Sequence, residues 1–139
     1  VLASQVEVDE TQLAAMGYCF GGMCALELAR AEVGLKGVAS FHGLLAASEL
    51  ANAANIDTKV LVLHGWNDPY VPVDQFEAFT AEMTKANVDW QLIAYGHAMH
   101  SFTNPNANSP AEGVAYHPLV ERRSWLALQQ FLKELFTDD

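Results

Sequence analysis

Four short runs of mostly apolar residues are the feature of this sequence that most restricts its fold. They cover residues 13–19, 37–43, 60–65 and 89–96, and helix-like segments separate them. The apolar residues in these runs are largely continuous and do not alternate with polar ones, as happens when helices cover both faces of a parallel sheet. The sequence therefore predicts an α/β fold with a mostly parallel sheet and helices on both faces.

The segments between and after the runs carry the apolar spacing of amphipathic helices. Helices are predicted over residues 22–34, 73–87 and from 118 onward. The Ala-rich stretch 48–55 is compatible with a further short helix. Residues 103–118 are rich in Asn, Pro and Gly, which predicts a loop.

Length and composition restrict the class of protein. With 139 residues, 51% of them hydrophobic and 17% charged, the chain suits one domain, which we place over residues 1–139. Seven basic and seventeen acidic residues give a net charge of −10 without a Lys/Arg cluster, so nucleic acids and anionic membranes are not expected partners. The chain lacks an apolar run of the roughly 18 residues that span a membrane, and its N-terminus lacks a signal-peptide pattern. We therefore expect a cytoplasmic protein whose two cysteines are reduced.

Cys19 lies at the end of the first apolar run, in the sequence Gly17-Tyr18-Cys19-Phe20-Gly21. This G-x-C-x-G pattern is the layout of a nucleophile elbow with Cys in place of Ser. The sharp turn strains the backbone of the nucleophile, and we expect glycines on both sides, Gly17 and Gly21, to avoid Cβ clashes. The N-terminus of the following helix favours a thiolate, and the backbone N–H of Phe20 is placed to donate to an oxyanion. Cys19 is therefore a candidate nucleophile.

An acidic residue and two histidines follow the third and fourth runs. Asp68 comes after the third run, and His97 and His100 come after the fourth. The order nucleophile, acid, histidine is that of α/β-hydrolase triads, and ligands bind at the carboxyl ends of parallel strands. Taken singly, each has a simpler interpretation: an inert buried Cys, a turn-forming Asp and a solvated His. Together, after three different strands, they favour a triad of Cys19, Asp68 and one of the two histidines.

The remaining reactive side chains have simpler interpretations. Cys24 lies within the first predicted helix, and we interpret it as a packing residue. His97 and His100 are spaced for a shared metal ion, but no third ligand lies nearby, so we predict no metal and no cofactor. His42 and His64 each follow an apolar stretch, and they either line the pocket or belong to the core.

Three motifs and the last predicted helix resemble the dienelactone hydrolase family of α/β hydrolases. The matching segments are MGYCFGG (16–22), HGWNDPYVP (64–72), YGHAMHSFTNP (95–105) and the helix within 115–136. The resemblance covers essentially the whole chain and implies that His100, not His97, is the general base and acid. It also implies that Cys19 is the nucleophile and that Asp68 orients His100. The candidate pocket residues within these motifs are Tyr18, Trp66, Ser101 and Phe102.

The resemblance implies hydrolysis of small esters or lactones. Cys19 would attack the carbonyl carbon to form a thioester, which water activated by His100 would clear. Family members that cleave dienelactone bind its carboxylate with arginines, one of them shortly after the catalytic histidine. Here the first arginine after His100 is Arg122. The implied substrates are therefore esters, lactones or thioesters in general rather than dienelactone itself.

Members of this family extend further at the N-terminus, so the resemblance implies that this chain is the C-terminal part of the full fold. The early strands of the sheet, a second oxyanion donor and an upstream glutamate near the nucleophile would then be missing. Loss of one oxyanion donor typically lowers kcat by about 10²–10³. An open edge strand would expose apolar surface, and we expect a second copy of the chain or a separate N-terminal piece to cover it.

Two other functions stay open at this point. A truncated relative of the hydrolases can serve as a module that dimerises or binds a partner without turnover. A thiol-redox function of Cys19 and Cys24 is less favoured, because their five-residue spacing does not match a C-x-x-C motif.

Overall fold

The computed structural model describes residues 4–48 and 55–137. The main sheet contains β1 (Ala14–Tyr18), β2 (Gly37–Phe41), β3 (Lys59–Gly65) and β4 (Trp90–Tyr95). Three helices accompany it, α1 (Phe20–Arg30), α2 (Val73–Lys85) and α3 (Pro118–Phe136). A small hairpin consists of β5 (Asn108–Ser109), the short helix η2 (Pro110–Glu112) and β6 (Val114–Ala115).

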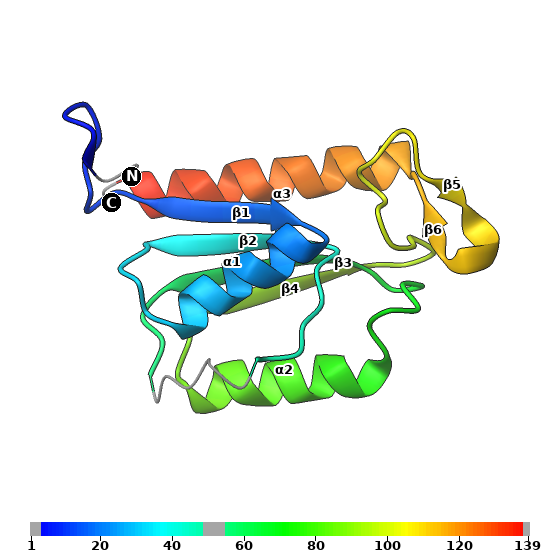
Figure 1. Ribbon diagram of the computed structural model, residues 1–139, viewed down its shortest axis with the longest axis horizontal. Helices are drawn as coiled ribbons and strands as arrows, with labels where there is room; N and C mark the ends of the chain where they lie inside the picture. The colour runs from blue at the N-terminus through cyan, green and yellow to red at the C-terminus, as the bar shows by residue number, and fades with distance from the viewer. Residues whose placement is uncertain (1–3, 49–54, 138–139) are drawn as a thin grey trace.

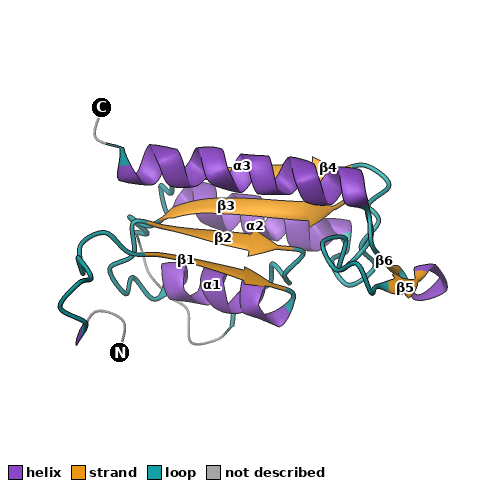
Figure 2. Ribbon diagram, turned by 90° about the horizontal axis from the view of Figure 1, so that it is seen from above, coloured by secondary structure: helices purple, strands orange, loops and turns teal. Residues whose placement is uncertain are grey.

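The four main strands are all parallel and lie in the order β1-β2-β3-β4. Helices α1 and α2 cover one face of this sheet, and α3 covers the other (Figures 1 and 2). The predicted α/β fold, with a parallel sheet between helices, is confirmed. Because the strands are parallel, the residues that follow them meet at the same end of the sheet, the end next to the β5–β6 hairpin (Figure 1).

Alternate residues of the central strands supply two separate cores. Val60 and Val62 of β3 face α1 and α2. Leu61 and Leu63 of the same strand face α3, where they join Leu128. All four β3 side chains are at most 1% exposed. Since neighbouring residues of a strand point to opposite faces, burial of both faces accounts for the continuous apolar runs in the sequence.

A buried arginine joins α1 to α2. Arg30 is 1% exposed, and it donates from Nε and Nη2 to the carboxylate of Glu82 at 2.7 and 2.8 Å. It also donates to Glu27 and to the carbonyl oxygen of Leu45, each at 2.8 Å. Burial alone would lower the pKa of Arg30, and the two glutamates raise it above its ordinary value instead. The guanidinium therefore stays charged between the two helices.

The structure differs from the sequence prediction in two places. Helix α1 ends at Arg30, short of the predicted end at Gly34, because the chain turns at Glu32, where φ is 50°. The stretch 103–118 was expected to be a loop, but it contains the β5–β6 hairpin; the helix predicted from residue 118 onward is confirmed by α3. The stretch 48–55, considered for a short helix, lies mostly outside the described residues.

β1 forms one edge of the main sheet, and in the part of the chain that the structure describes its strand partner is β2. Two large side chains on this strand, Met16 and Tyr18, are 41% and 42% exposed. The described helices include none that is long and apolar enough to cross a membrane.

Candidate active site

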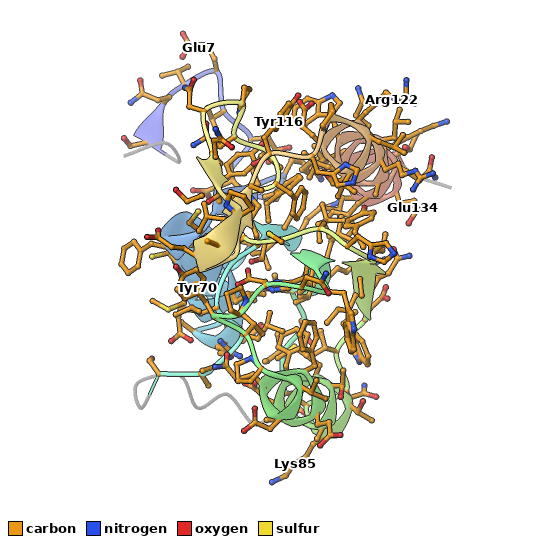
Figure 3. All side chains as sticks on the ribbon, turned by 90° about the vertical axis from the view of Figure 1, so that its right-hand side faces the viewer. Glu7, Tyr70, Lys85, Tyr116, Arg122 and Glu134 are labelled. Atoms are coloured by element: carbon orange, nitrogen blue, oxygen red, sulfur yellow. The ribbon has the colours of Figure 1, made fainter. Side chains whose placement is uncertain are left out.

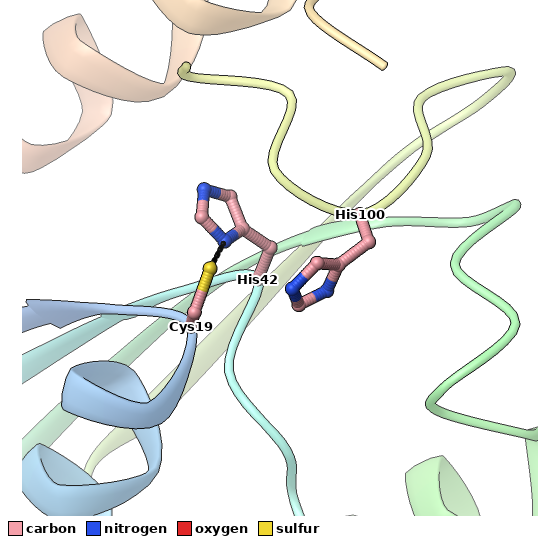
Figure 4. A group of neighbouring side chains, drawn as sticks. All are labelled: Cys19, His42 and His100. Carbon is pink, nitrogen blue, oxygen red and sulfur yellow. Dashed lines mark hydrogen bonds between the residues drawn. The ribbon is translucent and has the colours of Figure 1, made fainter. Parts of the chain in front are cut away.

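Four reactive side chains meet at the carboxyl ends of the four main strands. Cys19 directly follows β1, His42 follows β2, Asp68 lies in the turn after β3, and His100 lies beyond the end of β4. Figure 3 views the molecule from this end, and Figure 4 shows three of the four side chains. The parallel topology therefore brings together residues that are far apart in the sequence.

Cys19 sits at a strained strand-to-helix turn, with φ 51° and ψ −120°. The turn is tight, because a Cβ on Gly17 would lie 2.1 Å from the carbonyl oxygen of Gly21, and one on Gly22 would lie 2.6 Å from Ser40 Oγ. The expectation that Gly21 also avoids a clash is wrong, since a Cβ there would meet none of the described atoms within 4 Å. Gly17 and Gly22 are thus the glycines that this elbow requires.

The thiol of Cys19 rests against His42 rather than against His100. Its Sγ lies 3.4 Å from Nδ1 of His42 and 3.4 Å from Oγ of Ser101. The dashed line in Figure 4 marks the contact with His42. The nearest ligand atoms of Cys19, His42 and His100 nevertheless all lie within 4.8 Å of one another. A rotation about the Cα–Cβ bond of Cys19 is therefore the natural way to turn the sulfur toward His100.

Asp68 holds the ring of His100. Nδ1 of His100 lies 2.8 Å from Oδ2 of Asp68, and the backbone N–H of Tyr70 donates to Oδ1 at 2.9 Å. Nε2 of His64 lies 3.3 Å from the same Oδ2, without hydrogen-bond geometry. Burial alone would raise the pKa of Asp68, but the hydrogen bond with His100, the nearby His64 ring and the Tyr70 amide hold it well below its ordinary value. Asp68 is therefore an ionised, buried acceptor for His100.

His42 is a buried, neutral histidine. It is 1% exposed, its Nε2 lies 2.8 Å from Oγ1 of Thr103, and its ring stands edge-on to that of Phe102 with the centroids 5.0 Å apart. Burial, followed by the charges of His100 and His64, lowers the pKa of His42 to about 4. An uncharged imidazole therefore faces the thiol at neutral pH.

Two cavities adjoin Cys19. One, of about 390 Å³, lies toward α3, and its lining includes Tyr18, His42, Ser101 and Trp125. The other, of about 310 Å³, contains His100, and its remaining lining is mostly apolar: Phe20, Leu44, Tyr70 and Val114. Cys19 lines both cavities, so the elbow lies between them.

The four candidate pocket residues fall into two groups. Tyr18 and Ser101 line the larger cavity. Trp66 lines neither of these two cavities; it is half exposed and packs against Phe76, with ring centroids 5.4 Å apart. Phe102 is fully buried and packs under His42, because its apolar ring belongs to the core beneath α3.

Sequence reasoning did not single out several residues that surround the thiol. His42 carried a signal, since it follows β2 next to the strand that carries Cys19, but the sequence left its position open. Val114 carried no sequence signal, because it belongs to the hairpin that was not predicted. Its backbone pairs with that of His100. His97 is exposed and has a left-handed backbone with φ 64°, and it takes no part in the cluster of Cys19, His42 and His100.

Comparisons with known proteins bear on the family and the fold of the chain. The profile of the dienelactone hydrolase family matches residues 1–136. The protein K02A2.1 of Caenorhabditis elegans is 42% identical over 93% of this chain and 84% of its own length. Two solved structures superpose with a TM-score of 0.91: m3DLH, at 44% identity, and P91 from metagenomic libraries, at 42%, which is described as a dienelactone hydrolase-like promiscuous phosphotriesterase.

Most of these relatives are longer than this chain. The chain spans 57% of each of the two solved chains, which in turn match 98% of it. It spans 40% of a Yersinia pestis relative and 49% of an Escherichia coli K12 relative, both provisionally named carboxymethylenebutenolidases. Since the family profile extends over nearly the whole chain, and two solved relatives more than 40% identical share its fold, this chain belongs to the dienelactone hydrolase family of α/β hydrolases.

Proposed function

We propose that this chain hydrolyses small esters or lactones with Cys19 as nucleophile, His100 as general base and acid, and Asp68 as the residue that orients His100. The proposal rests on the hydrogen bond of 2.8 Å between Asp68 and His100, which lies close to Cys19. Membership of a hydrolase family supports the reaction class.

The reaction starts with transfer of the Cys19 thiol proton to Nε2 of His100, after the sulfur has turned away from His42. The thiolate attacks the carbonyl carbon, and the resulting oxyanion accepts a hydrogen bond from the Phe20 amide, the first N–H of α1, which has no acceptor within the helix. Collapse breaks the carbon–oxygen bond, and His100 returns the proton to the leaving alkoxide. Water, deprotonated by His100, then cleaves the thioester and releases the acid.

The cavity that contains His100 suggests the kind of substrate. Its volume is about 310 Å³, and its lining of Phe20, Leu44, Tyr70 and Val114 offers no charged side chain to bind a substrate carboxylate. We therefore propose uncharged esters, lactones or thioesters with small acyl groups. This agrees with the absence of an arginine in the segment just after His100.

The test is hydrolysis of an aryl acetate, a small lactone and an acyl thioester by the wild type and by Cys19→Ala. We expect turnover that Cys19→Ala abolishes and that the matched control Cys24→Ala retains. An aryl phosphotriester completes the panel, because P91 is described as a phosphotriesterase. Equal rates for the wild type and Cys19→Ala on every substrate would refute the proposal.

A second candidate function is a module that binds a partner without turnover. The exposed side chains of Met16 and Tyr18 on the edge strand β1 favour it. We propose that a second copy of the chain, or a separate polypeptide that supplies N-terminal strands, pairs along β1. Light scattering at tens of micromolar tests the first arrangement, and a monodisperse monomer would exclude it.

We further propose a reducing compartment such as the cytoplasm. Cys19 and Cys24 are both free thiols, and a thiol nucleophile works only while it is reduced.

A further inference from the structure

We propose that Cys19, His42 and His100 form a binding site for one Zn²⁺ ion. The three side chains follow three different strands, and their sulfur and nitrogen ligand atoms lie within 4.8 Å of one another (Figure 4). The binding itself is independent of the proposed hydrolysis. Its effect, reversible inhibition, rests on that proposed function, because the ion would occupy the same thiol and the same imidazole.

The spacing of the ligand atoms suits a tetrahedral ion. Zinc–sulfur bonds of about 2.3 Å and zinc–nitrogen bonds of about 2.0–2.1 Å place sulfur and nitrogen about 3.5 Å apart. The distance between Cys19 Sγ and His42 Nδ1 is 3.4 Å. The other two pairs lie within 4.8 Å, and a small rotation of Cys19 or His100 would bring them to bonding positions.

Each histidine is held by a hydrogen bond on its other nitrogen. Nε2 of His42 lies 2.8 Å from Oγ1 of Thr103, and Nδ1 of His100 lies 2.8 Å from Oδ2 of Asp68. These bonds leave Nδ1 of His42 and Nε2 of His100 available to a metal. Zinc-binding histidines in proteins are almost always supported in this way, with a carboxylate as a common partner.

The chemistry of the ligands selects the ion. One thiolate and two imidazoles form a set that zinc prefers, whereas Mg²⁺ and Ca²⁺ require oxygen ligands. The buried carboxylate of Asp68 adds a negative charge behind His100. Because Cys19 lines two cavities, a hydrated ion can reach the sulfur, and a fourth, water-filled position can remain.

Binding involves no change of oxidation state. The Cys19 thiol loses its proton to the solvent, one sulfur–zinc and two nitrogen–zinc bonds form, and the ion gives up the water molecules that these ligands replace. The nucleophile and the Nε2 lone pair of His100 are then both occupied. Hydrolysis would therefore stop, and a chelator would restore it.

The direct test is a zinc titration of the metal-free protein in competition with a chromophoric chelator. We expect one ion per chain, with affinity at least tenfold weaker in His42→Gln and unchanged in the control His97→Gln, whose histidine is exposed and outside the cluster. Thr103→Val removes only the supporting hydrogen bond and should weaken binding about 10- to 100-fold. Thr103→Val therefore still tests the site if His42→Gln does not fold.

Alkylation provides an independent measurement. Zinc should slow iodoacetamide labelling of Cys19, read by mass spectrometry, and leave Cys24 in the same chain unaffected, while Mg²⁺ should protect neither. Co²⁺ should give a thiolate-to-metal absorption band that Cys19→Ala lacks.

Three results would overturn the inference: no zinc bound by the wild type, unchanged affinity in both His42→Gln and Thr103→Val, or equal protection of the two cysteines. Hydrolysis is measured separately with chelator present. A protein that binds zinc but does not hydrolyse the substrates would support this site and refute the proposed function. A protein that hydrolyses the substrates but does not bind zinc would support the proposed function and refute this site.

Discussion

The sulfur of Cys19 lies 3.4 Å from Nδ1 of His42, while the proposed base, His100, is held by Asp68 at 2.8 Å. The thiol and its proposed base thus lie close together without being hydrogen-bonded to each other in the described structure. Because His42 is buried and neutral, it can accept the thiol proton in a hydrogen bond but gives the sulfur no full positive charge. In the described arrangement the partner of the sulfur is therefore a neutral imidazole and not a charged one.

Asp68→Asn should leave the fold intact and lower kcat for an aryl ester by about 10³–10⁴, since an amide at this position can hold the wrong tautomer of His100. The control His97→Gln should stay within twofold of the wild type. Steady-state kinetics at pH 7 provide the measurement. Retention of more than a tenth of the activity in Asp68→Asn would exclude the orienting role of this residue.

Burial of neutral His42 should make the fold less stable in acid. Its pKa is lowered to about 4 in the folded chain, against 6.5 ordinarily, so between these values the unfolded chain binds the extra proton. The stabilising contribution is complete above pH 6.5 and is lost as the pH falls toward 4, by on the order of 2–3 kcal/mol in total. The pKa of the Asp68 carboxylate is also depressed, so this group adds a further loss of stability only when the pH falls below the ordinary pKa of an aspartate.

Urea unfolding between pH 7 and 4.5, with chelator present, measures this dependence. The titratable groups near His42 include Cys19, Tyr18, His100, His64 and Asp68, and His42→Gln leaves all of these in place. We expect the variant to show a distinctly shallower loss of stability over this range. Parallel curves for the two proteins would contradict the assignment.

The elbow glycines allow a matched pair of alanine variants. Gly17→Ala places a Cβ 2.1 Å from a backbone oxygen that cannot move without displacing α1. We expect this change to lower the free energy of unfolding by at least about 2 kcal/mol and to abolish the activity. Gly21→Ala meets open space on a helix and should change stability by no more than about 1 kcal/mol, in the stabilising direction. Denaturant unfolding of both proteins distinguishes them, and similar losses would show that the turn is looser than described.

The Arg30 ion pairs should matter far more than the surface pair of Lys59 and Asp89. Arg30→Leu removes a buried cation from two glutamates and the Leu45 carbonyl, and we expect it to cost about 2–4 kcal/mol. Lys59 is 48% exposed in its side chain and pairs with Asp89 at 3.2 Å, so Lys59→Gln should cost less than about 1 kcal/mol. Thermal and urea unfolding of the two variants provide the comparison.

Much of the fold was predictable because the central strands β2 and β3 are buried on both faces and the long helices are buried on one. The continuous apolar runs follow from the first condition, and the spacing of Phe76, Phe79 and Met83 along α2 follows from the second. The juxtaposition of Asp68 and His100 was predictable for a related reason, since parallel strands deliver their following residues to the same edge.

The contact between Cys19 and His42 could not be derived in this way. It depends on a positive φ of 40° at His42 and on the particular rotamer of Cys19, and neither leaves a pattern in the sequence. The hairpin that carries Val114 was missed because its strands are two residues long, too short to show alternation. The expected roles of Cys19, Asp68 and His100 in catalysis stay predictions.

The position of Cys19 between two cavities bears on how a covalent intermediate would be cleared. An acyl group attached to the sulfur can fill one chamber while the other stays open to solvent. Water would then have its own route to the thioester and would not have to wait for the alcohol product to leave by the same path. Enlarging the alcohol should accordingly affect only the formation of the thioester, whereas enlarging the acyl chain should affect both its formation and its hydrolysis.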